Sequence, residues 1–229
     1  MNKSVKKEKK LFIIGDSAFA EVAYECFTHD SEYEVVGFSV EKEYRKKDTL
    51  FGLPVINLED ATSLYMPTEV EFYAALVYTD LNRLRARLYM AAKKMGYNPA
   101  SYISSSAFIW PNVELGEHCF IFENNTLQPF VKIANNVVLW SGNHIGHHSV
   151  VAENCFISSQ VVISGFCNID RNVFIGVNAA IGNNVHVAED NWIGPGVVIT
   201  SNTENNQLYN VDKALPARVS ARRFFRVPE

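Results

Sequence analysis

Half of the six histidines in this 229-residue chain fall within five positions, in the segment NHIGHHS at residues 143–149. An imidazole can take up a proton near neutral pH, so His147 and His148 are candidates for general-base chemistry. The cluster could instead bind a metal, but no Asp, Glu or Cys accompanies it at ligand spacing, and we expect no metal site. It could also hold neighbouring subunits together. No Ser or Cys occupies a nucleophile elbow, so a covalent intermediate is not expected.

A six-residue repeat must position these histidines. In steps of six from Ile103 to Ile199, seventeen consecutive positions hold Ile, Leu or Val, with no insertion. Neither the 3.6-residue period of a helix nor the two-residue period of a flat strand explains this spacing. A fixed six-residue repeat is typical of a β-helix, in which each hexad makes a short strand and a turn. Three hexads would close one triangular coil, and successive coils would stack to bury a continuous core.

The fourth residue after each aliphatic is small, never larger than Val or Asn. We therefore expect both residues to point into a narrow interior, with the residues between them forming an exposed corner. Asn125 and Asn143 lie one coil apart and should stack as an internal amide ladder.

The repeat also predicts the surroundings of the two histidines. Phe130 and Phe166, one coil before and one coil after, should flank His148, while Gly165 should lie above His147. His147 would then project beside flat backbone, in a walled pocket suited to a general base.

Residues 11–98 precede the repeat and end at Asn98-Pro99. Apolar runs (LFIIG, EVVGFS, GLPVI and EFYAALVY) alternate with segments of helical spacing. This order predicts a small parallel sheet with helices on its faces. Asp80 should cap the second helical segment, DLNRLRARLYMAAKKM, and Gly96 should end it.

The turn Gly15-Asp16-Ser17 after the first strand could offer backbone N–H groups and a helix N-terminus to a phosphate. Only one glycine of the dinucleotide fingerprint is present, so a tight turn that needs glycine is an equal alternative. Glu41 and Lys42 follow the second strand, where such a sheet would meet a ribose or diphosphate, or they are ordinary surface charge.

Composition argues against several classes of protein. The net charge of −4 does not favour nucleic-acid binding, and no apolar run approaches the ~20 residues of a membrane span. Residues 1–10 carry five lysines and should form a basic tail, because the apolar run behind them is too short for a signal peptide. Free thiols are expected in a reducing cytoplasm at Cys26 and at the inward positions Cys119, Cys155 and Cys167.

A small Rossmann-like domain joined to hexapeptide repeats resembles the bacterial nucleotide-sugar N-acyltransferases, a family that includes UDP-4-amino-sugar N-acetyltransferases and sialic-acid O-acetyltransferases. The resemblance extends from about Leu11 to Ser201 and is strongest in NHIGHHS, VVISGF and NVFIGVNAAIG. It implies a left-handed parallel β-helix over residues 99–203 and a homotrimer with active sites between neighbouring helices. It also implies an acetyl-CoA-dependent acetyltransferase of bacterial surface-polysaccharide or glycan biosynthesis that needs no metal.

By this resemblance His147 is the general base, and it assists direct attack of the acceptor on the thioester. His148 stands where the family usually has an acidic residue, so the group that orients the base differs here. Phe156 stands where the family has a histidine near the acyl thioester.

The resemblance places Gly165, with Ser164 and Asn183 beside it, against acyl-CoA, and a backbone N–H near Gly165 would stabilise the oxyanion. Residues 204–229 contain Pro216 and four arginines. They should cap the open end of the β-helix, although these arginines could also meet the phosphates of CoA.

The acceptor implied by the resemblance is a nucleotide-linked amino sugar, held by Gly15, Asp16 and Ser17 and, beside the base, by Asn143 and His144. Transfer to a hydroxyl, as in a sugar O-acetyltransferase, needs the same base and stays open. A metal-binding hexapeptide-repeat protein of a different class is the remaining alternative. The nucleotide, the position of the amine and the acyl length are open as well.

Overall fold

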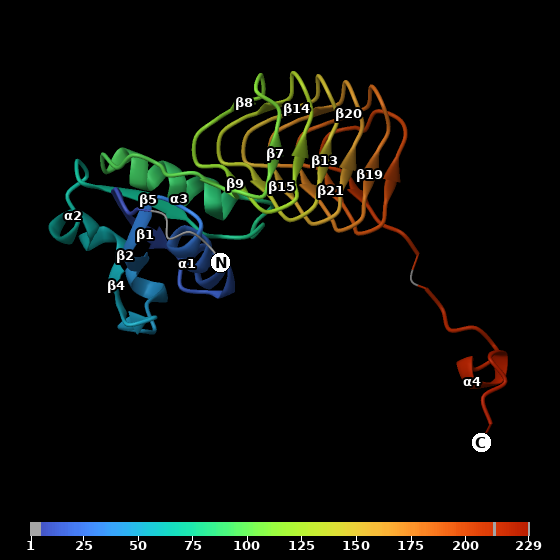
Figure 1. The fold of residues 1–229 in the computed structure, drawn as a ribbon, viewed down its shortest axis with the longest axis horizontal. Helices are drawn as coiled ribbons and strands as arrows, with labels where there is room; N and C mark the ends of the chain where they lie inside the picture. The colour runs from blue at the N-terminus through green and yellow to red at the C-terminus, as the bar shows by residue number, and fades with distance from the viewer. Residues whose placement is uncertain (1–5, 213, 229) are drawn as a thin grey trace.

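A computed structural model describes residues 6–212 and 214–228, which form an α/β domain and a long β-helix (Figure 1). Lys3, part of the predicted basic tail, lies outside the described residues. The α/β domain has one sheet in the order β3-β4-β2-β1-β5. Its strands are β1 (Lys9–Ile14), β2 (Tyr33–Val40), β4 (Leu53–Asn57) and β5 (Val70–Ala74), all parallel, and β3 (Thr49–Leu50), antiparallel at the edge.

Helices cover both faces of this sheet. Phe19, Ala23 and Phe27 of α1 (Ala18–His29) pack on one face, and Leu88 and Ala92 of α3 (Arg83–Lys94) pack on the other. The connections contain the short helices η1 (Lys42–Tyr44), η2 (Leu58–Asp60) and α2 (Ala61–Leu64). The alternation of apolar runs thus predicted the layers of this domain correctly.

The described part of the predicted basic tail is bound to the domain. Lys9 and Lys10 already belong to β1. The Nζ of Lys7 donates to the carbonyl oxygens of Phe27, at 3.1 Å, and Ser31, at 2.8 Å. A cation is favoured there because the last carbonyls of α1 carry the negative end of the helix dipole.

The predicted start of α3 is wrong. Asp80 does not cap the helix, which begins at Arg83 after Asn82. The φ angles of Asp80, Leu81 and Asn82 are 52°, 50° and 69°, a left-handed conformation that cannot begin a right-handed helix. Gly96, with a φ of 96°, follows the end of α3 as predicted.

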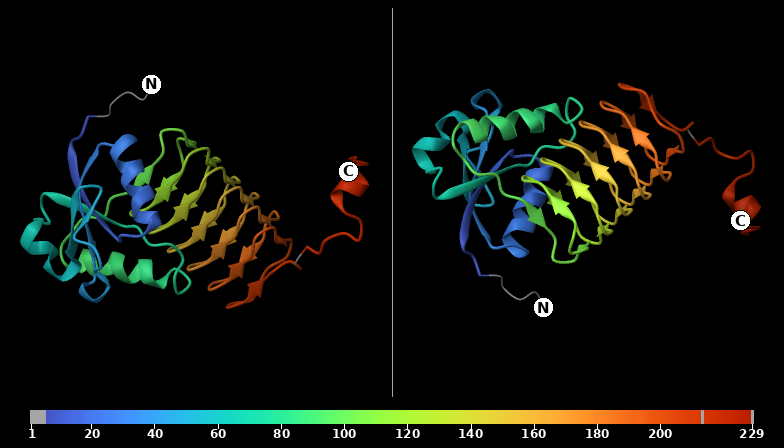
Figure 2. Two further views of the ribbon diagram at one scale, coloured as in Figure 1. Left: turned by 90° about the horizontal axis from the view of Figure 1, so that it is seen from below. Right: turned by 90° about the horizontal axis from the view of Figure 1, so that it is seen from above.

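The repeat forms a triangular β-helix whose three faces are parallel sheets, stacked coil upon coil in Figure 2. The covered face, which the α/β domain contacts, contains β6 (Tyr102–Ile103), β9 (Phe120–Ile121), β12 (Val138–Leu139), β15 (Phe156–Ile157), β18 (Phe174–Ile175), β21 (Trp192–Ile193) and β23 (Leu208–Tyr209). The open face contains β7 (Phe108–Ile109), β10 (Thr126–Leu127), β13 (His144–Ile145), β16 (Val162–Ile163), β19 (Ala180–Ile181) and β22 (Val198–Ile199). The polar face contains β8 (Glu114–Leu115), β11 (Lys132–Ile133), β14 (Val150–Val151), β17 (Asn168–Ile169) and β20 (His186–Val187).

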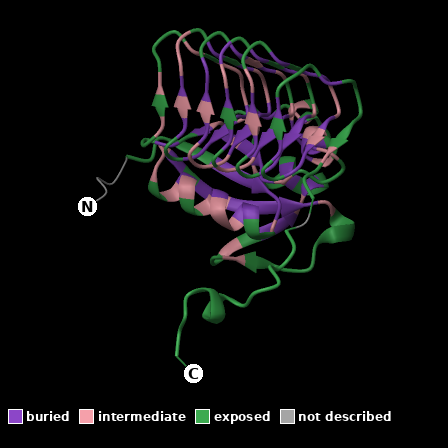
Figure 3. Cartoon of the chain, turned by 90° about the vertical axis from the view of Figure 1, so that its right-hand side faces the viewer, coloured by how far each residue is buried: buried purple, intermediate pink, exposed green. Residues whose placement is uncertain are grey.

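The interior is the one that the six-residue period predicts. The repeat aliphatics from Ile121 to Ile199 and the small residues from Cys119 to Val197 are buried, in one continuous core visible in Figure 3. Ile103, at the first coil, is 41% exposed because no earlier coil covers it. The prediction of a β-helix is confirmed.

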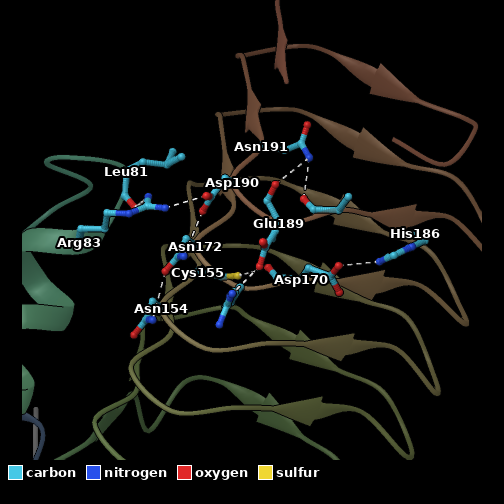
Figure 4. A network of polar contacts seen from close by, with 12 residues as sticks. Leu81, Arg83, Asn154, Cys155, Asp170, Asn172, His186, Glu189, Asp190 and Asn191 are labelled. Atoms are coloured by element: carbon cyan, nitrogen blue, oxygen red, sulfur yellow. Dashed lines mark hydrogen bonds and ion pairs between the residues drawn. The ribbon is translucent and has the colours of Figure 1, made fainter. Parts of the chain in front are cut away.

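The predicted amide ladder lies elsewhere. The side-chain amides of Asn125 and Asn143 do not bond each other; both donate to the carbonyl oxygen of Trp140, at 2.8 and 2.6 Å. A ladder of amides does form at the corner between the polar and covered faces, which we call the ladder corner. There the Asn136, Asn154 and Asn172 side chains and Asp190 bond in sequence, eighteen residues apart; Figure 4 shows the last three.

The α/β domain packs on the covered face through aromatic rings and on the ladder corner through polar groups. Phe19 and Phe27 contact Phe120, while Tyr78 stacks edge-on against Phe174 and Trp192. The two units therefore share one apolar core.

Arg85 of α3 is fully buried at the ladder corner. Its guanidinium donates to the Oδ1 of Asn136 at 3.1 Å and to the carbonyl oxygens of Val77, Asn154 and Cys155 at 3.1, 2.9 and 3.2 Å. Burial lowers the pKa of Arg85 to about 10. These neutral oxygens compensate for the lost hydration of the cation, so the side chain joins the two units.

The C-terminal segment caps the β-helix only in part. The chain reaches the last coil as far as β23, whose Tyr209 packs against the core. The described residues 210–212 and 214–228 are exposed, and Figure 1 shows them running away from the coils to α4 (Ala221–Phe224). The polar composition of 204–207 and 210–212 leaves little apolar surface to lay over the end. Within the described ranges, no helix is long and apolar enough to cross a membrane.

Replacing a repeat aliphatic at mid-helix should destabilise the protein. Ile157 is fully buried, so Ile157→Ala should lower the free energy of unfolding by about 2–5 kcal/mol through lost contacts and a cavity. Ile103→Ala, at the exposed first coil, should cost less than about 1 kcal/mol. Urea unfolding of both variants measures the difference; equal costs would contradict a core that is continuous at mid-helix and open at its first coil.

Buried His118 should make folding sensitive to acid. Its Nε2 accepts from the Ala74 N–H at 2.8 Å and its Nδ1 donates to the Oδ1 of Asn136 at 2.9 Å, so the ring is neutral. Burial lowers the pKa of His118 to about 3, whereas an unfolded histidine titrates near ~6.5.

As pH falls below ~6.5 the unfolded chain takes up a proton that the folded protein refuses, so stability should fall until the pH reaches about 3. Between pH 7.5 and 5 the wild type should lose about 2 kcal/mol more than His118→Asn, whose side chain suits the same left-handed backbone. Urea unfolding at both pH values tests this; parallel curves would contradict it.

Candidate functional site

His147 and His148 occupy a corner between β13 and β14, where the open and polar faces meet; we call it the histidine corner. Both side chains are exposed. The backbone beneath them is held by neighbouring coils: the His147 N–H donates to the Oε1 of Gln128 at 2.9 Å, and the His148 N–H to the carbonyl of Pro129 at 3.1 Å. Two imidazoles are thus presented to solvent on rigid backbone.

Gly165 makes room for the ring of His147, as the coil spacing predicts. A Cβ on Gly165 would lie 2.9 Å from the Cε1 and 3.0 Å from the Nε2 of His147. The imidazole therefore lies against bare backbone, at a distance that any other residue would prevent.

His148 lies between two phenyl rings, also as predicted. The ring centroids of Phe130 and Phe166 are 4.5 and 4.8 Å from that of His148, with interplanar angles of 27° and 17°. The Nδ1 atoms of His147 and His148 are 3.1 Å apart, so one of them donates a hydrogen bond to the other. The structure thus brings together His147, His148 and Gly165.

The N–H of Gly165 itself is already in use, because it donates to the Oδ1 of Asn183 at 3.0 Å. Ser164 lies beside it, and its carbonyl oxygen accepts from the hydroxyl of Ser149 at 2.8 Å. Ser164, Gly165 and Asn183 do lie next to His147, and an oxyanion donor near Gly165 other than this N–H stays a prediction.

Asn143 is not available to a ligand. Its side chain is buried inside the β-helix, where Nδ2 donates to Trp140 and Oδ1 accepts from the N–H of Val161. Its position in the repeat points inward, so the predicted substrate contact is wrong. His144 points outward on the open face, half-buried, in register with Thr126 and Val162.

Phe156 lies on a different face of the β-helix from His147. It is buried on the covered face, where the ring of Tyr78 and the guanidinium of Arg85 contact it. The role near the thioester that the resemblance implies for this position therefore cannot be filled here.

The α/β domain contains a cavity of about 700 Å³ at the carboxyl ends of β1, β2 and β5. The predicted residues Gly15, Asp16 and Ser17 line it. Gly15 has a φ of 121° and an added Cβ would lie 3.1 Å from the carbonyl oxygen of Ala75, so the tight turn needs glycine. Ligands bind α/β sheets at this edge.

The two arginines that line this cavity, Arg83 and Arg87, were missed from the sequence. Arg87 donates two hydrogen bonds to the carboxylate of Glu41, at 2.5 and 2.8 Å, and holds the pKa of Glu41 below its ordinary value. Arg83 also lines the cavity and pairs with Asp190 of the ladder corner at 2.7 Å. Lys47 donates to the carbonyl of Asp16 at 3.1 Å. The four-residue spacing of Arg83 and Arg87 on one helix was the available signal.

The cavity and the histidine corner lie on different sides of one chain. The α3 helix, which walls the cavity, contacts the ladder corner, whereas the histidines project where the polar and open faces meet. No residue of the histidine corner lines the cavity. Within residues 6–212 and 214–228, no group of three or more His, Cys, Asp or Glu side chains is arranged to hold a metal ion.

No protein-family model and no curated protein sequence matches this chain. Solved structures do match it. The acetyltransferase domain of PglB from Neisseria gonorrhoeae aligns with a TM-score of 0.75 and 18% identity over 88% of this chain and 96% of that one. It is also solved with acetyl coenzyme A, at a TM-score of 0.76 and 20% identity over 87% and 95%. PerB from Caulobacter crescentus, in complex with CoA and GDP-perosamine, has a TM-score of 0.76 and 20% identity over 87% and 92%. The chain shares their fold.

Filling the space above Gly165 should displace the ring of His147. Gly165→Ala places a Cβ about 3 Å from two ring atoms, so the imidazole must turn away, and its NMR chemical shifts should change. Gly182→Ala is the matched control, because its added Cβ would have its nearest neighbour at 3.5 Å. Unchanged His147 shifts in the Gly165 variant would contradict the stacked position.

Proposed function

We propose that this protein is an acetyl-CoA-dependent N-acetyltransferase that acts on a nucleotide-linked amino sugar. One observation carries the proposal: the exposed imidazole of His147 lies against the bare backbone of Gly165. The fold supports it, since PglB is an acetyltransferase solved with acetyl coenzyme A and PerB is solved with CoA and GDP-perosamine.

His147 acts as the general base. As the sugar nitrogen attacks the thioester carbonyl carbon and the C–N bond forms, Nε2 of His147 accepts a proton from that nitrogen. The C–S bond then breaks and the proton passes to the leaving thiolate of CoA. No metal and no covalent acyl-enzyme are needed, because the amine is itself the nucleophile.

Acetyl-CoA binds along the stacked corners beside His147. The pantetheine arm runs along the backbone beside Gly165 and the ring of His147, with Ser164 and the exposed residue Asn183 next to it. The arginines of residues 214–228 are exposed and provide cations for the CoA phosphates.

The nucleotide binds in the cavity of the α/β domain, which functions as a Rossmann-like site. Its volume of about 700 Å³ suits a nucleoside diphosphate. Leu76, Leu84 and Leu88 supply apolar wall for the base, and Glu41 stands at the end of β2 where it can accept from a ribose hydroxyl. Gly15, Asp16 and Ser17 place the N-terminus of α1 near the diphosphate.

The proposal includes a homotrimer of left-handed β-helices, in which the α/β domain of one subunit faces the histidine corner of its neighbour. The separation of cavity and base in one chain calls for such a neighbour. The open face supports it, because Phe108, Val162 and Val198 project from that face with 56, 45 and 64% exposure. Free cysteines fit the cytoplasmic location that we include in the proposal.

A thiol-release assay with acetyl-CoA against UDP-, dTDP- and GDP-linked amino sugars tests the function. We expect turnover on one sugar, unaffected by EDTA, and a loss of ~10²–10⁴-fold in kcat for His147→Ala with CoA still bound. His186→Ala is the matched control: it removes an exposed histidine of the polar face, paired with Asp170, and should keep full activity.

Turnover that survives in His147→Ala would remove this residue as the base. If no amino sugar is acetylated while CoA still binds, and the corresponding hydroxyl sugars are acetylated, the protein is an O-acetyltransferase and the proposed N-transfer is wrong. Failure to bind CoA would overturn the acyltransferase proposal altogether.

A further inference from the structure

A histidine that acts as a base at Nε2 must carry its own proton on Nδ1. In this chain the Nδ1 of His147 is 3.1 Å from the Nδ1 of His148, so it is the nitrogen already engaged in a hydrogen bond. Of the two possible donors, only His147 as the donor leaves a lone pair on its Nε2. Whether His148 is the acceptor therefore decides whether the Nε2 of His147 can take up a proton.

The two phenyl rings fix the position of the His148 ring. Phe130 and Phe166 stack on opposite faces of its ring, and the ring of His147 meets Phe166 edge-on at 5.0 Å. The ring plane of His148 is therefore set by its neighbours, and its Nδ1 edge is directed at His147.

This arrangement is built at some conformational cost. The φ angles of Phe130, His148 and Phe166 are 65°, 59° and 59°, in the left-handed region that bulky residues rarely adopt. Asparagine or glycine takes the same place at most other corners, for example Asn178 and Gly196. Two phenylalanines at such positions flank the residue whose Nδ1 meets the Nδ1 of His147.

Among residues 6–212 and 214–228, no charged side chain forms a hydrogen bond or an ion pair with His147 or His148. The groups against the two histidines are Phe130, Phe166, Gly165 and the amide of Gln128, none of which ionises. Of the strands beside this corner, β13 carries His144, and β11 carries Lys132, which pairs with Glu114 at 2.9 Å. Cys167 of the next coil points inward. The hydrogen-bond partner of the His147 Nδ1 is therefore an imidazole, and no carboxylate takes part.

We propose that His148 is a positioning residue that accepts the Nδ1–H of His147 and so fixes the base-competent tautomer of that ring. The effect of His148 on catalysis rests on the proposed function, whereas its effect on the tautomer of His147 rests on the geometry of the pair alone. The opposite direction, with His148 as the donor, would put the proton of His147 on Nε2 and leave no lone pair there to accept a proton from the substrate.

Two substitutions separate positioning from stacking. His148→Phe keeps an aromatic ring between Phe130 and Phe166 but removes the acceptor, and His148→Glu restores an acceptor as a carboxylate. We expect His148→Phe to lower kcat by ~10–100-fold with an unchanged KM for acetyl-CoA. His148→Glu should recover most of kcat and move the acid limb of the pH–rate profile to higher pH, because an adjacent anion favours protonated His147.

Asn178→Phe is the matched control, since it places the same ring at a left-handed corner away from the histidines. It should retain wild-type kcat and the wild-type pH profile. Wild-type kcat in His148→Phe, or an acid limb that does not move in His148→Glu, would overturn the positioning role.

Nitrogen NMR of the histidine rings tests the same inference without substrate. The free wild-type protein should show His147 as the Nδ1–H tautomer at neutral pH, and His148→Phe should lose that preference. An Nε2–H tautomer of His147 in the wild type would overturn the inference. If the expected tautomer is found and no acetyl transfer occurs on any sugar, the proposed function fails and the positioning of His147 by His148 stands.

Discussion

The structure depends on one constraint, the unbroken register of eighteen residues per coil. From β6 to β22, paired strands of the β-helix are parallel and eighteen residues apart, as Leu127 and Ile145 are, and the buried aliphatics lock that pairing. Equivalent positions of successive coils therefore stack at close range. The stacking of Phe130, His148 and Phe166, and the approach of His147 to Gly165, are both consequences. A one-residue insertion in either neighbouring coil would turn inward positions outward and separate these groups.

The same register prepares a second corner for the α/β domain. Asn136, Asn154 and Asn172 present a row of amides and carbonyl oxygens, and Arg85 inserts its guanidinium among them. A buried cation without a carboxylate is tolerated because each contact is a hydrogen bond to a neutral oxygen. A second contact at this corner stabilises the left-handed turn before α3, since the side-chain amide of Asn82 donates to the carbonyl oxygen of Asn172 at 3.1 Å. The domain is thus attached at a different corner from the one that carries the histidines, and we propose that a second subunit completes the active site.

At the histidine corner, backbone N–H groups that could bind a ligand are already hydrogen-bonded within the chain. The N–H groups of His147 and Gly165 are bonded to the side chains of Gln128 and Asn183. The reactive potential of the corner therefore lies in the imidazole pair. His147 is hydrogen-bonded to an imidazole that is itself held between two phenyl rings. Such a base suits proton transfer from an incoming amine, which is the chemistry we propose.

The sequence by itself determined which residues face inward and which neighbours stack. In a β-helix those properties depend only on position in the repeat, so the core from Ile121 to Ile199 and the flanking of His148 followed from counting. The handedness of the coil stays a prediction. Only the tertiary structure decided the start of α3, the true amide ladder, the use of the Gly165 N–H and the inaccessibility of Phe156. These depend on contacts between residues far apart in the chain, such as Arg85 with Asn154, which no local period encodes. A repeat specifies its own interior; what docks on its surface is set by partners outside the repeat.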